Sequence, residues 1–130
     1  MKKVWTNGCF DILHIGHLKM LEYAKGKGDY LVVGIDSDLR VKEMKGNDRP
    51  YNNENDRKAF LESIKFVDEV VIFGSKEEFE EIIITHQIDT IVVGEEYKHG
   101  TVLGSSLAHV DFFPRYKNHS TSKILSRKNI

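Results

Sequence analysis

Two short apolar runs constrain the fold of this chain most strongly. Residues 31–35 (LVVGI) and 91–93 (IVV) lack the alternation of apolar and polar side chains that a strand with one wet face shows. Such runs are typical of strands buried on both faces, as in a parallel sheet covered by helices. β-like and amphipathic helical segments alternate along the chain. We therefore predict an α/β fold, with a Rossmann-like, doubly wound, mainly parallel five-stranded sheet and helices on both faces.

The predicted elements follow from these patterns. We expect strands at residues 3–6, 30–36, 69–73, 90–94 and 110–113, and helices at residues 16–27, 53–64, 76–86 and 120–127. Asn53 and either Ser120 or Thr121 are the expected helix caps. Residues 41–50, rich in cations and ending in Arg-Pro, predict a mobile loop. Because ligands of doubly wound folds bind beyond the carboxyl ends of the strands, we expect a single site there.

Composition excludes several other classes. The 130 residues suit one domain, here residues 1–130. A formal net charge of -1 favours neither a nucleic-acid partner nor a membrane surface. The N-terminus has no apolar stretch after its lysines and no run approaches the length of a bilayer span, so we expect a cytoplasmic protein. The single cysteine, Cys9, excludes an intrachain disulfide.

The segment from Asn7 to His17 joins the first strand to the first helix. The start of that helix presents unpaired backbone N–H groups and the positive end of the helix dipole, so a phosphate can bind near Gly16. His14 and His17 can point the same way and add N–H donors. Half of a zinc site and idle surface histidines are the alternatives. The other histidines are scattered and provide no second ligand cluster, so we predict a phosphate site.

This segment resembles the signature of the cytidylyltransferase-like nucleotidyltransferases. The likeness continues in order through Lys45-Gly46, the Arg57 helix, the turn at residues 94–97 and residues 120–124. Members of this superfamily transfer a nucleotidyl group from a nucleoside triphosphate to a phosphorylated small molecule and release pyrophosphate. The resemblance implies such an enzyme, with Mg²⁺ accompanying ATP or CTP. The signature G-x-F-D-x-x-H-x-G-H is formed by Gly8, Phe10, Asp11, His14, Gly16 and His17.

The resemblance also implies roles for individual residues. The catalytic residues it implies are His14, His17 and Lys45. The acceptor-binding residues are Asp36, Asp38, Lys42, Arg57 and Lys65, of which Lys65 replaces an arginine of one branch and lacks its bidentate fork. Asp11 could hold a metal or simply form a turn. The nucleotide-binding residues are Asn7, Gly8, Cys9, Phe10, Asp11, Gly16, Gly94, Glu96, Tyr97, Arg115, Ser120, Thr121 and Ser122.

The branch of the superfamily decides the substrates. Residues 6–11, 45–50 and 94–105 resemble adenylyltransferase domains that make ADP-heptose from heptose 1-phosphate, in precursor synthesis for surface glycans. The short length and residues 113–115 resemble glycerol-3-phosphate cytidylyltransferases, the second candidate, and flavin adenylyltransferases are a third. A nucleotide-binding subunit without catalysis is the alternative of another class. The resemblance implies a homodimer, and Phe60, Phe66 and Phe73 exceed what one small core needs.

Overall fold

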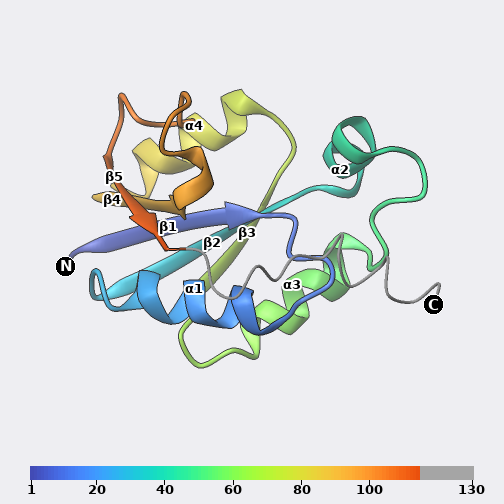
Figure 1. Cartoon of the computed structure of the whole chain (residues 1–130), viewed down its shortest axis with the longest axis horizontal. Coiled ribbons are helices and arrows are strands. Elements are labelled where there is room, and N and C mark those ends of the chain that lie inside the picture. Colours follow the sequence, from blue (N-terminus) through green and yellow to red (C-terminus); the bar gives the residue numbers. More distant parts are fainter. Residues whose placement is uncertain (115–130) are drawn as a thin grey trace.

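The computed structural model describes residues 1–114, which form an α/β domain around one sheet (Figure 1). The sheet has the strand order β3-β2-β1-β4-β5, and each of its pairings is parallel. The strands are β1 (Lys3–Gly8), β2 (Tyr30–Asp36), β3 (Glu69–Phe73), β4 (Thr90–Gly94) and β5 (His109–Phe113). The helices are α1 (Ile15–Lys25), α2 (Asp38–Lys45), α3 (Glu54–Glu62) and α4 (Lys76–Thr85), with a 3-10 turn, η1 (Glu95–Tyr97). The predicted fold is confirmed.

Helices cover both faces of the sheet, as the doubly apolar runs predict. Because successive strand residues point to opposite faces, Val4 and Trp5 of β1 belong to different cores. Helices α1 and α3 cover the Val4 face and α4 covers the Trp5 face (Figure 1). The first core includes Val4, Leu21, Leu31, Val33 and Leu61, and the second includes Trp5, Val32, Phe79, Ile83 and Ile91.

The Trp5 ring packs closely against Gly34 of the neighbouring strand. A Cβ atom at Gly34 would overlap the Trp5 ring, so only glycine fits this position of β2. The indole nitrogen of Trp5 donates a hydrogen bond to Oδ1 of Asn7 at 2.9 Å. The buried ring therefore fixes a side chain at the carboxyl end of β1, where the ligand site of such a fold lies.

The prediction of a loop over residues 41–50 is wrong in its first half, because α2 occupies residues 38–45. Ser37 caps this helix by accepting a hydrogen bond from the backbone N–H of Arg40. Val41 is its one buried residue, so the sequence shows little helical periodicity. Gly46 then ends the helix with a φ of 102°, which glycine adopts readily.

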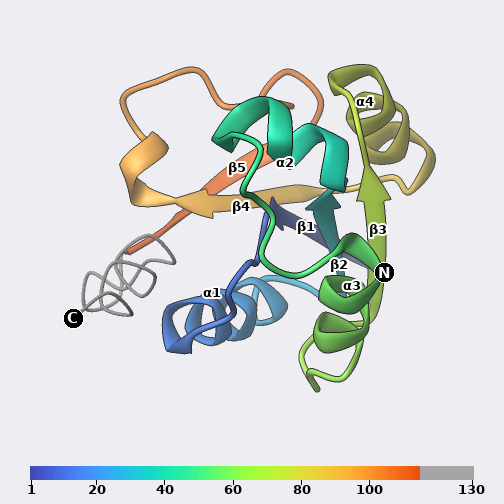
Figure 2. The ribbon, with the colours of Figure 1, turned by 90° about the vertical axis from the view of Figure 1, so that its right-hand side faces the viewer.

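Helix α2 lies beyond the carboxyl ends of the strands rather than over the middle of a face (Figure 2). This position makes it one wall of the region where β1 and β2 end. The predicted helix at residues 120–127 lies outside the described residues. Among the helices of residues 1–114, none is long and apolar enough to cross a membrane.

Candidate functional site

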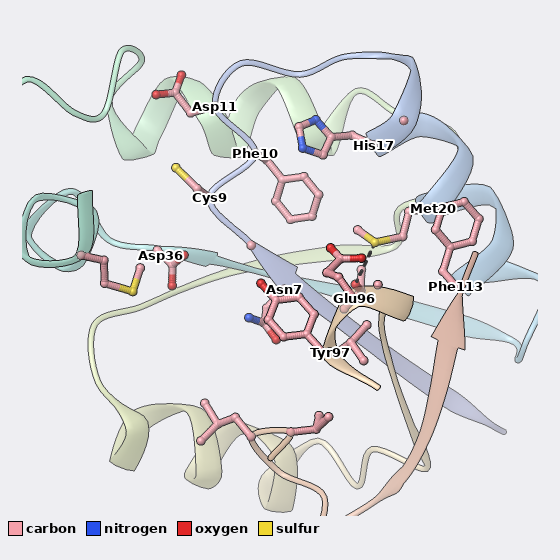
Figure 3. Close-up of a pocket in the computed structure, with 18 of the residues that line it drawn as sticks. Asn7, Cys9, Phe10, Asp11, His17, Met20, Asp36, Glu96, Tyr97 and Phe113 are labelled. Carbon is pink, nitrogen blue, oxygen red and sulfur yellow. Dashed lines mark hydrogen bonds between the residues drawn. The ribbon is translucent and has the colours of Figure 1, made fainter. Parts of the chain in front are cut away.

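A cavity of about 710 Å³ opens at the carboxyl ends of β1, β2, β4 and β5 (Figure 3). In Figure 3, Asp36 lies on one side of Asn7, and Glu96 and Phe113 lie on the other. The cavity thus has a β2 side and a β4–β5 side, separated by the end of β1. The predicted residues that line it are Asn7, Gly8, Cys9, Phe10, Asp11, His14, Gly16, His17, Asp36, Lys45, Gly94, Glu96 and Tyr97.

The two histidines cap α1 and hold each other in place. Nδ1 of His14 accepts a hydrogen bond from the backbone N–H of Gly16 at 3.0 Å, and Nδ1 of His17 accepts one from the N–H of His14 at 3.2 Å. The rings stack with centroids 3.9 Å apart and planes inclined by 23°. Because a backbone N–H can only donate, both Nδ1 atoms are unprotonated. Each neutral ring therefore carries its proton on Nε2.

His17 stays neutral over the whole physiological pH range. Burial lowers its pKa to about 3, and the neighbouring His14 ring and Lys45 ammonium act in the same direction. A neutral imidazole at this position donates a hydrogen bond from Nε2 without giving up its proton. Burial likewise raises the pKa of the Cys9 thiol at the cavity wall, so this cysteine is a poor nucleophile.

Phe10 supports the His17 ring from the loop that follows β1. The two ring centroids are 5.2 Å apart and the planes are inclined by 59°. Phe10 is buried and has a φ of 52°, a left-handed conformation that is unusual for a side chain of this size. Such a conformation persists only where the surroundings enforce it, and it often occurs at functional sites.

The carboxylate of Asp11 anchors the segment that precedes α3. It is almost fully buried and accepts hydrogen bonds from the backbone N–H groups of Tyr51 and Asn52 and from the Asn52 amide. Nη2 of Arg49 donates to the backbone carbonyl of Asp11 at 2.9 Å. Residues 1–114 contain no group of three or more His, Cys, Asp and Glu that could hold a metal ion. The geometry therefore favours an anchoring role for Asp11 over metal binding.

Arg57 is completely buried behind the cavity wall. Nη1 donates to the carbonyls of Cys9 at 3.0 Å and Asp36 at 2.8 Å, and Nε donates to the carbonyl of Asn52 at 3.0 Å. Nη2 pairs with Oδ1 of Asp38 at 2.8 Å. The predicted substrate residues Arg57 and Asp38 thus contact each other, and Arg57 ties together three segments around the site.

Comparison with known proteins identifies the family. The family model described as Cytidylyltransferase-like matches residues 5–127. The chain belongs to this family. The bifunctional protein HldE of Campylobacter jejuni (strain RM1221) is 46% identical over 127 residues, covering 97% of this chain and 27% of that protein. HldE of a Nitratiruptor species is 46% identical over 125 residues, covering 95% and 27%. The chain spans about a quarter of the length of these relatives.

Two solved structures have folds similar to that of this chain. The lipopolysaccharide core biosynthesis protein from Thermoplasma volcanium has a TM-score of 0.71 and 28% identity, covering 92% of this chain and 99% of that one. Pantothenate synthetase from Thermus thermophilus has a TM-score of 0.67 at 14% identity, covering 99% and 64%. The second likeness shows the fold alone.

Helix α2 presents a cavity-facing set of residues in this cytidylyltransferase-like domain that sequence reasoning partly missed. Arg40 and Met44 line the cavity together with Lys45. Arg40 and Met44 are four residues apart, a helical spacing that could have indicated this face. Further lining residues that were not predicted are Thr6, Met20, Val93, Thr101, Val102, Leu103 and Phe113.

Some predicted residues are not brought to the cavity. Lys42 is exposed and does not line it. Lys65 lies shortly before Glu69, where β3 begins, at the end of the sheet opposite the cavity, and its Nζ is 5.2 Å from the centroid of the Phe66 ring. Neither lysine is among the residues that line the cavity. Arg115, Ser120, Thr121 and Ser122 lie outside the described residues.

Proposed function

We propose that the protein is a nucleotidyltransferase that joins a nucleoside triphosphate to a phosphorylated sugar and releases pyrophosphate. The observation that carries this proposal is the stacked histidine pair at the start of α1, with a neutral His17, inside a large cavity. The similarity to HldE, together with the sequence resemblance to heptose 1-phosphate adenylyltransferase domains, favours ATP and a sugar 1-phosphate of the heptose type. The likeness to a lipopolysaccharide core biosynthesis protein supports a role in surface-glycan precursor synthesis.

The reaction needs positioned donors rather than a covalent intermediate. An acceptor phosphate oxygen attacks the α-phosphorus in line, the bond to the bridging oxygen breaks, and pyrophosphate leaves. His14 and His17 donate hydrogen bonds from Nε2 to phosphoryl oxygens, and the Lys45 ammonium offsets the negative charge that develops there. The acceptor phosphate is already ionised at neutral pH, so the reaction requires no strong general base. This matches a His17 that does not titrate in the physiological range.

The two sides of the cavity suit the two substrates. The β4–β5 side carries Tyr97 and apolar Val102 and Leu103, beside the polar Glu96 and Thr101. A planar base binds well against such a surface, and polar groups at its edge can select it. The β2 side carries charged residues from the end of β2 and from α2, which suit a polar acceptor.

We propose that Mg²⁺ enters with the triphosphate and is held mainly by its oxygens. The described residues offer no metal cluster, and the carboxylate of Asp11 is occupied by Tyr51 and Asn52. Mg²⁺ bound in this way keeps several waters and neutralises phosphate charge, as is usual for nucleotide substrates. Titrating Mg²⁺ against a fixed ATP concentration tests this, since activity should then saturate as the ATP becomes complexed.

We further propose a homodimer of a single nucleotidyltransferase domain in the cytoplasm, without nucleic-acid or membrane partners. Of the three aromatic residues that suggested an interface, Phe73 is buried and Phe66 packs against the core. Phe60 is 50% exposed and supports a contact between copies. Size-exclusion chromatography with light scattering measures the mass of the protein in solution. A mass equal to that of one chain would contradict the dimer.

The decisive experiment measures pyrophosphate release with Mg²⁺ across ATP and CTP, each with heptose 1-phosphate, glycerol 3-phosphate and other phosphorylated sugars. Release with ATP and a sugar 1-phosphate is the expected result. Release with CTP and glycerol 3-phosphate would assign the chain to the cytidylyltransferase branch instead. Binding of a triphosphate without release from any acceptor would favour a nucleotide-binding subunit.

A further inference from the structure

An ion pair on the β2 side of the cavity has no part in the phosphate chemistry described above. Nε of Arg40, in the first turn of α2, donates to Oδ1 of Asp36, the last residue of β2, at 2.9 Å. Both residues line the cavity. The Asp36 side chain is 9% exposed and that of Arg40 is 24% exposed. This ion pair is therefore largely sheltered from water and still borders the cavity, where a ligand could contact it.

The Arg40 guanidinium is held in one orientation. Its central carbon lies 5.2 Å from the centroid of the buried Phe73 ring, at the end of β3. The aromatic face and the Asp36 carboxylate therefore fix the guanidinium from two directions. Within residues 1–114, the Arg40 guanidinium uses only Nε, and the Asp36 carboxylate uses only Oδ1, for hydrogen bonds. The two Nη atoms of Arg40 and Oδ2 of Asp36 remain for a ligand.

The chemistry of these atoms selects hydroxyl groups over phosphate. The Nη atoms only donate, and the carboxylate oxygen only accepts, whereas a hydroxyl does both. A phosphate would be attracted by Arg40 and repelled by Asp36, because the pair is neutral as a whole. The Lys45 ammonium and the histidine-capped start of α1 line the same cavity and suit a phosphate better.

We infer that the Asp36–Arg40 pair recognises neighbouring hydroxyl groups of the acceptor, with Oδ2 accepting from one and Nη donating to another. This inference rests on the proposed function and names the polyhydroxylated part of its acceptor. Ribose of the nucleotide has the same chemistry. The acceptor is the better match, because Asp36 lies across Asn7 from Glu96, on the side away from the surface that suits the base (Figure 3).

Calorimetric binding tests this without catalysis. Heptose 1-phosphate and inorganic phosphate are titrated into the wild-type protein, and the ratio of their dissociation constants measures what the sugar adds. We expect the sugar to add about tenfold or more in affinity, the size of one or two hydrogen bonds to charged groups. Taking the ratio cancels the effect that a change of net charge has on both anions.

Asp36→Asn removes the negatively charged oxygen that accepts from one hydroxyl, and Arg40→Met removes the N–H groups that donate to the other. Each should reduce the ratio by about tenfold, the value of one hydrogen bond to a charged group. Arg40→Lys keeps the positive charge and loses the second donor edge, so it should lower the ratio as well. Lys76→Met removes a cation from the exposed first turn of α4 and should leave the ratio unchanged. Thermal midpoints check that each variant is folded. If Arg40→Met does not fold, Arg40→Lys takes its place in the comparison.

Three outcomes overturn the inference. The wild-type protein could bind both anions equally, the three site variants could keep the wild-type ratio, or the variants could erase the preference for ATP over 2′-deoxy-ATP. The last result would assign the pair to the ribose. Pyrophosphate release by the wild-type protein reports separately on the proposed function, so failure of one does not imply failure of the other.

Discussion

Replacing Arg57 by methionine should destabilise the fold rather than remove a substrate contact. The guanidinium is fully buried and donates to three backbone carbonyls, those of Cys9, Asp36 and Asn52. Methionine has a similar apolar stem but no donor. The variant therefore leaves these carbonyls without their partner while it preserves most of the packing of α3.

The size of the effect follows from burial. A buried carbonyl that loses its donor costs about 1–3 kcal/mol, and the contacts to Cys9 and Asp36 lie in the interior. The Asn52 carbonyl and the Asp38 carboxylate are partly exposed, so water replaces Arg57 there at smaller cost. We expect a loss of about 4 kcal/mol in the free energy of unfolding, a large part of the roughly 5–15 kcal/mol of a typical domain. The thermal midpoint should fall by roughly 10–20 °C.

Urea unfolding followed by circular dichroism measures this loss. Lys58→Met, at the next position of α3, is the matched control because it changes a neighbouring cation that makes none of these contacts, and it should change the free energy by less than about 0.5 kcal/mol. Unchanged stability of Arg57→Met combined with loss of acceptor binding would refute the reasoning. Arg57 would then reach the substrate directly.

The remaining predictions concern the cavity. His17→Ala should lower kcat by about 10²–10³-fold, since it removes one positioned donor, and a cooperative thermal transition checks that the variant is still folded. Intact turnover in a pyrophosphate assay would place His17 away from the phosphates. Lys45→Ala should raise the KM for the triphosphate with little change in the urea midpoint, because Lys45 is exposed, and a collapse in stability would make it structural. His17 also predicts an effect of pH on stability, because its pKa is lowered from 6.5 to about 3 in the folded protein. This shift adds to the free energy of unfolding in full above pH 6.5, and the added stability is lost as the pH falls from 6.5 toward 3. His17→Gln should therefore flatten the decline in stability below pH 6.5 in acid titrations, and an identical decline in both proteins would contradict the lowered pKa.

The sheet could be predicted because its signals are local. Residues 31–35 and 91–93 are apolar without alternation, and the structure buries all of them except the half-buried Val93 in the two cores. The Asn7–His17 segment was likewise readable, since a strand, a glycine-containing turn and a helix follow one another within a few residues. Helix α2 escaped prediction because Val41 is its one buried residue, and its remaining turns face solvent or the cavity.

By itself, the sequence determined the layered α/β architecture, the edge of the sheet where the cavity lies, and the paired histidines at the start of α1. Only the tertiary structure decided which charged side chains are buried in the fold and which face the cavity. Arg57 and Arg40 both lie in helices of the structure, yet one is buried against three carbonyls and the other faces the cavity beside Asp36. The physical reason is that burial and hydrogen-bond partners depend on segments far apart in the chain. Asp11 and Asn52, or Arg57 and Cys9, meet only after the sheet has brought their loops to one edge.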